Sequence, residues 1–266
     1  MKKLVKLNSA RNCLRYLIKA YKIGTLYVPH YICPCIKSIL RKEITNIKYY
    51  HIDDKFMPAE KFRADSYILY PNYFGICTNN VRLLEKEYRN LIVDNSHAFY
   101  AQPMGLASLN SLRKFFQMRY GVMDGAYLYT EKIIEQPIRT ADDYEIDEDI
   151  TYEKIIKNEH RIDNEPLMYI SKTTEKIMSY IDFEDEKIIR LNNFFKFAQK
   201  YDKINELSFN LEKDEIPFVY PLYTHDEEIG YNLEKQGLQI YRYWDGLPAT
   251  FDEYNYYKYL IPIPLY

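Results

Sequence analysis

Residues 91–97 read LIVDNSH, and residues 111–116 read SLRKFF. An apolar run closed by a polar cluster is typical of a short buried strand, which we predict to end at Asp94. The stretch places a carboxylate at a strand end, an imidazole soon afterwards at His97, and an amine further on at Lys114. This stretch decides the fold class, because the same strand pattern recurs upstream.

Short apolar runs and helical patterns alternate through the first half of the chain. We predict strands at residues 25–28, 47–51, 67–70 and 91–93, and helices at residues 9–21, 34–41 and 81–88. Strands separated by helices indicate βαβ units, and therefore a mainly parallel sheet in an α/β fold. Such sheets bind ligands at the carboxyl ends of their strands, so the residues after Val28, Tyr70 and Val93 are candidates for chemistry.

The second half of the chain differs in its composition and in its pattern of predicted elements. Residues 131–165 are rich in charge and include the acidic run 142–149, which we interpret as a solvated connection. Residues 166–203 read as two helices. In the tail, strand and helix signals alternate at residues 218–220, 227–235, 238–243 and 259–263. We predict a large α/β domain over residues 1–165, and a helical connection with a small C-terminal α+β domain over residues 166–266.

The composition narrows the functional classes. The chain has 266 residues, 47% of them hydrophobic, which is enough for a substantial core. A formal net charge of −2 argues against a general nucleic-acid binder, which normally carries a basic excess. The sequence has no run of 18 or more apolar residues, and Lys6, Asn8 and Arg11 interrupt any signal-peptide core. We therefore expect a cytoplasmic protein with reduced cysteines and no membrane segment.

Residues 30–35, which read HYICPC, offer a rival constellation together with His51 and Cys77. Two cysteines and two histidines are a ligand set that zinc accepts. However, Cys33 and Cys35 are spaced as C-x-C rather than the C-x₂-C of common zinc sites, and no second paired half follows. We therefore expect no metal site.

Lys114 and Asp94 together suit one kind of covalent cofactor chemistry. Pyridoxal 5'-phosphate (PLP) needs a lysine amine for its Schiff base and a carboxylate that keeps its pyridine nitrogen protonated. A strand-end aspartate followed by a lysine in an apolar setting supplies both groups. The same residues also allow a structural interpretation, in which Asp94 caps the next helix and the Lys114 stem lies along apolar surface.

The order of several short segments resembles the DegT-like sugar aminotransferases, which are PLP enzymes of fold type I. Residues 91–97 are similar to the aspartate strand of that family, and residues 111–125 to its lysine segment with the following glycine turn. The other matches, in chain order, are SARNCL at 9–14, VPHYIC at 28–33, NYFG at 72–75, RLNNF at 190–194, PFVYP at 217–221 and RYW at 242–244. The resemblance implies a fold-type-I large domain with a small C-terminal domain.

The resemblance also implies a role for each matched residue. Lys114 forms the Schiff base and acts as general base, Asp94 pairs with the pyridinium nitrogen, and His97 lies beside the cofactor ring or its phenolic oxygen. The implied cofactor-binding residues are Ser9, Ala10 and Arg11 at a phosphate-binding helix N-terminus, Tyr31 near the ring face, and a hydroxyl from Ser108 or Ser111.

The chain departs from the family pattern at two of these places. Glycine usually stands at the position of Ala10, where the backbone turn faces the cofactor phosphate. Serine usually stands at the position of Leu109, for which Ser108 and Ser111 are substitutes. Tyr31 also fits an ordinary core position.

The function that the resemblance implies is amino transfer. The amino group would come from an amino-acid donor such as glutamate and pass to a keto-sugar carried on a nucleotide, for surface polysaccharide synthesis. A homodimer is implied, because the family builds its site across a dimer interface. Two alternatives stay open: another PLP reaction on the same scaffold, such as dehydration or decarboxylation, and a non-catalytic binding module.

Overall fold

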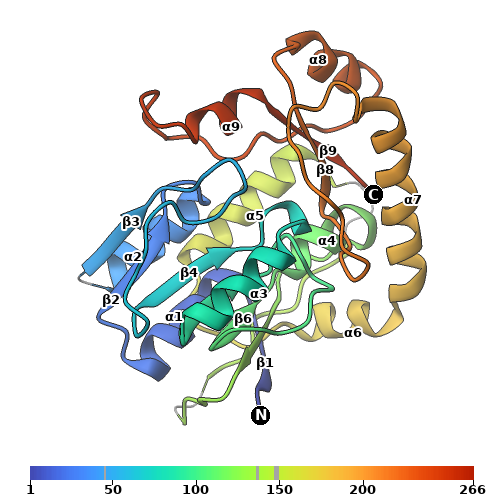
Figure 1. The fold of residues 1–266 in the computed structure, drawn as a ribbon. Helices are drawn as coiled ribbons and strands as arrows, with labels where there is room; N and C mark the ends of the chain where they lie inside the picture. Colours follow the sequence, from blue (N-terminus) through green and yellow to red (C-terminus); the bar gives the residue numbers. More distant parts are fainter. Residues whose placement is uncertain (45, 136–137, 147–149) are drawn as a thin grey trace.

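A seven-stranded sheet in the order β1-β7-β6-β5-β4-β2-β3 forms the centre of the protein (Figure 1). This computed structural model describes residues 1–44, 46–135, 138–146 and 150–266. The strands of the sheet are β1 Lys3–Leu7, β2 Thr25–Pro29, β3 Asn46–Tyr50, β4 Tyr67–Pro71, β5 Asn90–Asp94, β6 Ala107–Leu109 and β7 Ala126–Thr130. A second, smaller sheet pairs β8 Val219–Tyr223 with β9 Leu260–Pro264 in antiparallel fashion.

The large sheet is mixed, but mostly parallel. β7 runs antiparallel to both of its neighbours, β1 and β6, whereas the pairs β2–β3, β2–β4, β4–β5 and β5–β6 are parallel. The predicted α/β class is therefore confirmed. Because β1, β5 and β6 share a direction, the residues that follow Leu7, Asp94 and Leu109 meet at one edge of the sheet.

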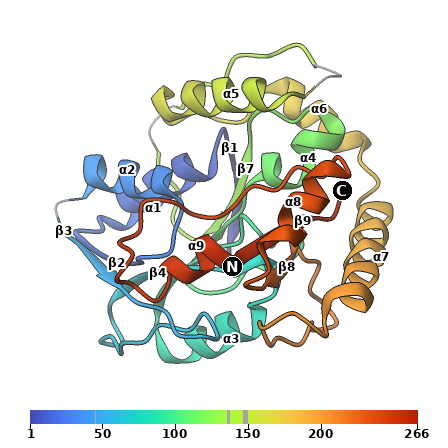
Figure 2. The same cartoon turned by 90° about the horizontal axis from the view of Figure 1, so that it is seen from above.

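Helices cover both faces of this sheet (Figure 2). The helices are α1 Ala10–Tyr21, α2 Pro34–Glu43, α3 Thr78–Glu87, α4 Leu112–Tyr120, α5 Tyr152–Asn164, α6 Lys172–Tyr180, α7 Phe183–Tyr201, α8 Glu227–Lys235 and α9 Tyr254–Tyr259, with a 3₁₀ turn at Tyr73–Gly75. No helix among the described residues is long and apolar enough to cross a membrane.

The apolar run of β5 is continuous because the strand is buried on both faces. Ile92 packs into the core that α1 and α2 cover, whereas Leu91 and Val93 pack into the opposite core with residues such as Val81 of α3. Successive side chains of a strand point to opposite faces, so a strand between two helical layers needs apolar residues at every position. This requirement accounts for the continuous apolar run that predicts the strand.

Three strands of the large sheet were missed, and one predicted strand was wrong. β1 and β6 carry too few apolar residues in a row to stand out. β7 has such a run, Ala126–Tyr129, but it was not predicted as a strand. Residues 238–243, which alternated like a strand, form no regular element. The small C-terminal sheet is the expected α+β part, while the boundary at residue 165 stays a prediction.

The charged segment 131–165 is more than the solvated connection that we expected. Its second part forms α5, in which Ile162 is buried and Glu159 is bound to arginines of α1 and α4. Charge in this helix therefore serves contacts within the fold, a role that composition alone does not reveal. Of the acidic run 142–149, residues 147–149 lie outside the described part of the chain.

Candidate active site

A cavity of about 390 Å³ lies at the carboxyl edge of the large sheet, and we call it the edge cavity. Its volume falls within the range of about 300–1,000 Å³ that is usual for small-molecule sites. Seven of the nine predicted site residues line it: Ser9, Ala10, Arg11, Asp94, His97, Ser111 and Lys114. They come from the start of α1, the end of β5 and the start of α4, as the sheet topology requires.

Lys114 lies in the first turn of α4, just after the N-cap residue Ser111. Its ammonium nitrogen Nζ lies over the ring of Tyr243, 5.3 Å from the ring centroid. No carboxylate of the described chain forms an ion pair with it. The amine is therefore held on an aromatic face and stays open to a ligand in the cavity.

Asp94 ends β5 and is only 8% exposed. Its carboxylate Oδ1 accepts a hydrogen bond from the backbone N–H of Ser96 at 2.9 Å. Burial raises the pKa of the Asp94 carboxyl, although the Ser96 contacts and the charge of Lys114 oppose that rise. A buried carboxylate with so few donors gains strongly from a cationic partner.

His97, three residues after Asp94, is surrounded by aromatic side chains. Its ring stacks on Phe218 at a centroid distance of 4.7 Å and on Trp244 at 5.5 Å. Burial, with a smaller contribution from the charge of Lys114, lowers the pKa of His97 well below its usual value. The imidazole is therefore neutral at physiological pH, and it lines the cavity from among aromatic rings.

Gly75 allows the close packing around His97. Its φ of +77° is in the left-handed region, and an added Cβ would lie 2.4 Å from the backbone oxygen of His97 and 3.2 Å from the backbone nitrogen of Phe218. Only glycine fits both the conformation and this approach. The loop after β4 thereby reaches the strand end that carries the cavity.

The N-terminus of α1 faces the edge cavity. Ser9 is its N-cap and accepts a hydrogen bond from the Asn12 N–H at 3.2 Å, so the Ser9 hydroxyl is engaged in capping. Ala10 is the first helical residue and has no positive φ, so the turn does not require the usual glycine. Arg11 is buried and forms ion pairs with Glu159 and Asp163 of α5.

Glu159 and Arg113 complete the cavity, and neither was singled out from the sequence. Glu159 bridges Arg11 and Arg113, and these two arginines hold the pKa of its carboxyl below the usual range although burial acts to raise it. Glu159 and Asp163 are one helical turn apart, which places them on one face of α5. That spacing was the available signal, but it is common on solvated helices.

Two predicted residues do not reach the cavity. The Ser108 hydroxyl is bound to the backbone of Met104 in the preceding loop. It donates to the Met104 oxygen at 2.6 Å and accepts from the Met104 N–H at 2.8 Å. Tyr31 is fully buried and donates to the Tyr243 backbone oxygen at 2.6 Å. Of the two candidate hydroxyls, the structure thus brings Ser111 rather than Ser108 to the cavity, and Tyr31 supports the wall from behind.

Cys33 and Cys35 also line the edge cavity as free thiols, with their sulfur atoms 2.8 Å apart. Hydrogen bonding from Cys35 lowers the pKa of Cys33 to about 7, against burial and with help from Lys114. No group of three or more metal-ligating side chains occurs among the described residues.

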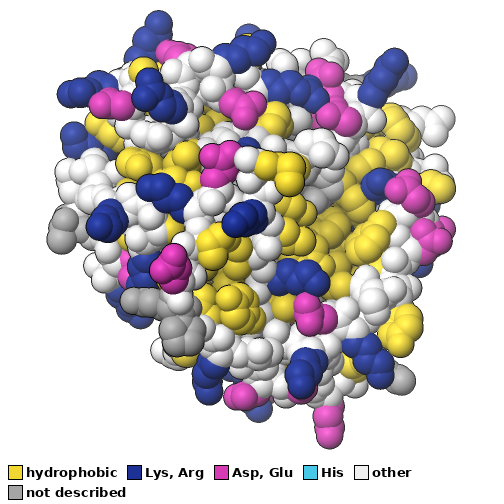
Figure 3. Space-filling model, turned by 90° about the horizontal axis from the view of Figure 1, so that it is seen from below, with side chains coloured by type: hydrophobic (Ala, Val, Ile, Leu, Met, Phe, Trp, Pro, Cys, Tyr) yellow, Lys and Arg dark blue, Asp and Glu magenta, His cyan; other side chains and the backbone are white. Residues whose placement is uncertain are grey.

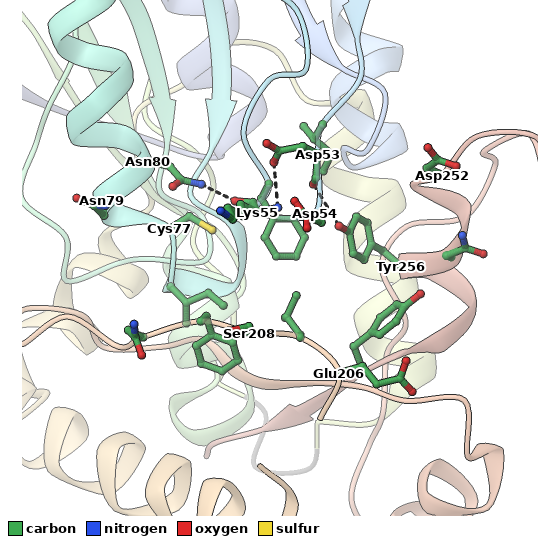
Figure 4. A pocket seen from close by; sticks show the side chains of 18 of the residues that line it. Asp53, Asp54, Lys55, Cys77, Asn79, Asn80, Glu206, Ser208, Asp252 and Tyr256 are labelled. Atoms are coloured by element: carbon green, nitrogen blue, oxygen red, sulfur yellow. Dashed lines mark hydrogen bonds between the residues drawn. The ribbon is translucent and has the colours of Figure 1, made fainter. Parts of the chain in front are cut away.

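A larger cavity, of about 730 Å³, lies on the other side of an aromatic wall, and we call it the outer cavity (Figure 4). Figure 4 shows Asp53 and Asp54 on one side of it and Glu206 and Ser208 on the other. None of the nine predicted site residues lines it. The larger of these two cavities and the predicted chemistry therefore occupy different places.

Comparison with solved structures gives matches over almost the whole chain. A DegT DnrJ EryC1 StrS aminotransferase from Brucella abortus superposes with a TM-score of 0.65 at 11% identity, covering 99% of this chain and 80% of that one. Helicobacter pylori PseC, an aminotransferase involved in the biosynthesis of pseudoaminic acid, gives 0.62 at 14% identity, with 99% and 81% covered. A putative sugar aminotransferase, Spr1654 from Streptococcus pneumoniae, gives 0.61 at 14% identity, with 99% and 81% covered.

The chain has the fold of the sugar aminotransferases. The fold-type-I architecture that the sequence resemblance implied is thereby confirmed. By sequence alone, no family model and no curated protein matches the chain. At such low identity the likeness establishes the fold, and the activity has to be argued from the site itself.

Proposed function

We propose that the protein is a PLP-dependent aminotransferase that moves an amino group from an amino-acid donor to a keto-sugar carried on a nucleotide. The observation that carries the proposal is the edge cavity, which brings the amine of Lys114 and the buried carboxylate of Asp94 together with a helix N-terminus. These are the three groups that a pyridine aldehyde phosphate needs.

When bound, PLP supplies an electron sink that stabilises negative charge on a substrate carbon. Lys114 would hold the cofactor covalently and carry the proton at Nζ. Asp94 would hold the proton of the ring nitrogen, because a buried carboxylate is stabilised by a cation. Neutral His97 would lie beside the ring without adding charge to it.

The apolar lining of the cavity supports the same reading. Ile32, Phe218 and Val219 line it together with Trp244, so the reacting groups lie among side chains that exclude water. A low-polarity wall strengthens the electrostatic contacts of Asp94 and Lys114 with a ligand.

The sugar substrate and the dimer are the finer parts of the proposal. Support for a sugar comes from the solved relatives in fold, among them the putative sugar aminotransferase from Streptococcus pneumoniae. A second copy of the chain would cover part of an apolar surface: on the face seen in Figure 3, hydrophobic side chains gather around a hollow. We propose a homodimer in the cytoplasm.

The test is an absorbance spectrum of the purified protein with added PLP, before and after borohydride. We expect a band that borohydride fixes, with the adduct mapped by mass spectrometry to the peptide that contains Lys114. Lys114→Ala removes the adduct entirely while the fold is kept. Lys86→Ala, at an exposed position of α3, is the matched control and keeps it.

The outcomes separate the alternatives. A fixed adduct that remains in Lys114→Ala contradicts the lysine assignment. No band at saturating PLP favours a binding module. If an adduct forms on Lys114, assays with amino donors and nucleotide-linked keto-sugars distinguish amino transfer from dehydration or decarboxylation, because only amino transfer converts the donor amino acid to its keto acid.

A further inference from the structure

The two carboxylate oxygens of Glu159 each contact a different arginine. Oε2 accepts from the guanidinium of Arg11 on α1, and Oε1 accepts from that of Arg113 on α4. The arginine side chains are only 6% and 8% exposed, whereas that of Glu159 is 32% exposed. A single carboxylate from α5 thus contacts two buried cations at the edge cavity.

Arg113 depends on this contact more than Arg11 does. Within the described residues Glu159 is the one partner of Arg113, whereas Arg11 also pairs with Asp163 and donates to the backbone oxygen of Glu159. A buried guanidinium without an anion is strongly unfavourable. When Glu159 leaves this place, binding of another anion there is therefore favoured.

We propose that Arg11 and Arg113 form an anion subsite for a phosphoryl group, and that Glu159 occupies it as a competitor within the same chain. The inference rests on the proposed function in so far as the phosphoryl group belongs to PLP or to a nucleotide sugar. Two guanidinium groups beside the N-terminus of the twelve-residue helix α1 are an arrangement that binds phosphate well. The bound carboxylate marks the place as one that holds an anion.

Glu159 and a phosphoryl group exclude each other. Both are negatively charged, and both need the same two guanidinium groups at contact distance, so simultaneous occupancy adds like-charge repulsion in a poorly solvated cavity. The affinity for the ligand is then reduced by the fraction of molecules in which the subsite is free.

Displacement of Glu159 leaves α5 attached. Asn158 and Arg161 donate to the Met123 backbone oxygen at 2.7 and 3.4 Å, and Ile162 is buried. These contacts do not involve Glu159. A change of its side-chain rotamer is sufficient to free the subsite, and Glu159→Gln is expected to fold.

The experiment compares three probes in the wild type and in Glu159→Gln. PLP and pyridoxal differ only in the phosphate, and uridine diphosphate carries phosphate without the pyridine ring. We expect Glu159→Gln to bind at least one phosphorylated probe about ten-fold more tightly than the wild type does. This is the gain that results if Glu159 occupies the subsite in about nine-tenths of the wild-type molecules. Pyridoxal binding changes by less than two-fold.

Asp163→Asn is the matched control, because it removes an ion pair between α5 and α1 while it leaves the bridging carboxylate in place. It should change each affinity less than Glu159→Gln does. Arg113→Gln provides an independent test that does not need Glu159→Gln to fold: it should weaken binding of the phosphorylated probe and leave pyridoxal unaffected.

A gain for PLP alone assigns the subsite to the cofactor, a gain for uridine diphosphate alone assigns it to the nucleotide sugar, and a gain for both assigns it to either phosphoryl group. Unchanged or weaker binding of both phosphorylated probes in Glu159→Gln overturns the proposal, as does an equal gain for pyridoxal. If neither PLP nor pyridoxal forms an adduct with Lys114 in any variant, the proposed function fails, while the uridine diphosphate arm still tests the subsite.

Discussion

The edge cavity and the outer cavity are separated by a layer of aromatic side chains, and their charged residues have different roles. In this aromatic wall, the ring centroid of Tyr31 lies 5.0 Å from that of Trp244, which lines the edge cavity. It lies 5.5 Å from that of Tyr256, which lines the outer cavity. The outer cavity has nearly twice the volume, about 730 against 390 Å³. Volume alone would select the wrong cavity for the predicted chemistry.

The carboxylates of the outer cavity serve local structure. Asp53 accepts from the backbone nitrogens of Lys55 and Met57 and so holds its own loop, and Glu206 pairs with His225 at an exposed position. In the edge cavity, by contrast, the side chains of Asp94 and Arg113 are buried. Among the described residues, the Asp94 carboxylate is hydrogen-bonded to Ser96, and the Arg113 guanidinium to Glu159. Buried charge with few partners, rather than size, distinguishes a candidate site.

The sharpest way to break this comparison is Asp94→Asn. The amide keeps the shape of the side chain but removes the negative charge that would hold a protonated ring nitrogen. We expect the rate of amino transfer to fall by a factor of about 100 or more, as is usual when a preorganised electrostatic partner is lost. Steady-state kinetics with the identified substrates measures the fall.

Asp94 is also the N-terminal anchor of the turn that Ser96 closes, so the folded state of Asp94→Asn has to be compared by circular dichroism. A variant that folds normally and transfers amino groups at the wild-type rate contradicts the role of the carboxylate.

A smaller effect concerns His97 and pH. Its folded-state pKa is depressed, so below the unfolded value of about 6.5 the unfolded chain binds a proton that the folded chain does not bind. Stability is therefore lost as the pH falls below about 6.5, by at most about 1.4 kcal/mol per pH unit from this group. Denaturant unfolding at several pH values from about 7.5 to about 5.0 measures how the free energy of unfolding depends on pH on both sides of this pKa.

His97→Asn removes this contribution. The variant has a lower stability at neutral pH because it loses the stacking on Phe218, but its free energy of unfolding depends less steeply on pH than that of the wild type. Equal slopes in the two proteins would show that His97 titrates alike in both states, against its burial.

The smallest effect is expected in the outer cavity. Asp54→Asn removes an exposed charge from its lining, and we expect PLP adduct formation to change by less than about two-fold. Titration of the fixed adduct in both proteins makes the comparison. A large loss in this variant would reverse the roles that we assign to the two cavities.

The sequence by itself determined the central strands and the predicted residues of the edge cavity. Continuous apolar runs such as that before Asp94 are required by burial on both faces, and parallel strands deliver their carboxyl ends to one edge. The strand that ends at Asp94 was predicted, whereas the helix α4 that carries Lys114 was not, and the resemblance to the family linked the two residues. The order of the family-like segments added Ser9 and Arg11 to the same edge.

Tertiary structure alone decided the rest. The place of β7 in the sheet, antiparallel between β1 and β6, depends on pairing between segments far apart in the chain, and local sequence does not specify such pairing. Whether Ser108 or Ser111 faces the cavity depends on a turn, and the position of Glu159 depends on how α5 packs against two other helices. Ion pairs between residues far apart in the chain leave no trace in local periodicity, because a charged residue looks the same whether it faces solvent or a buried arginine.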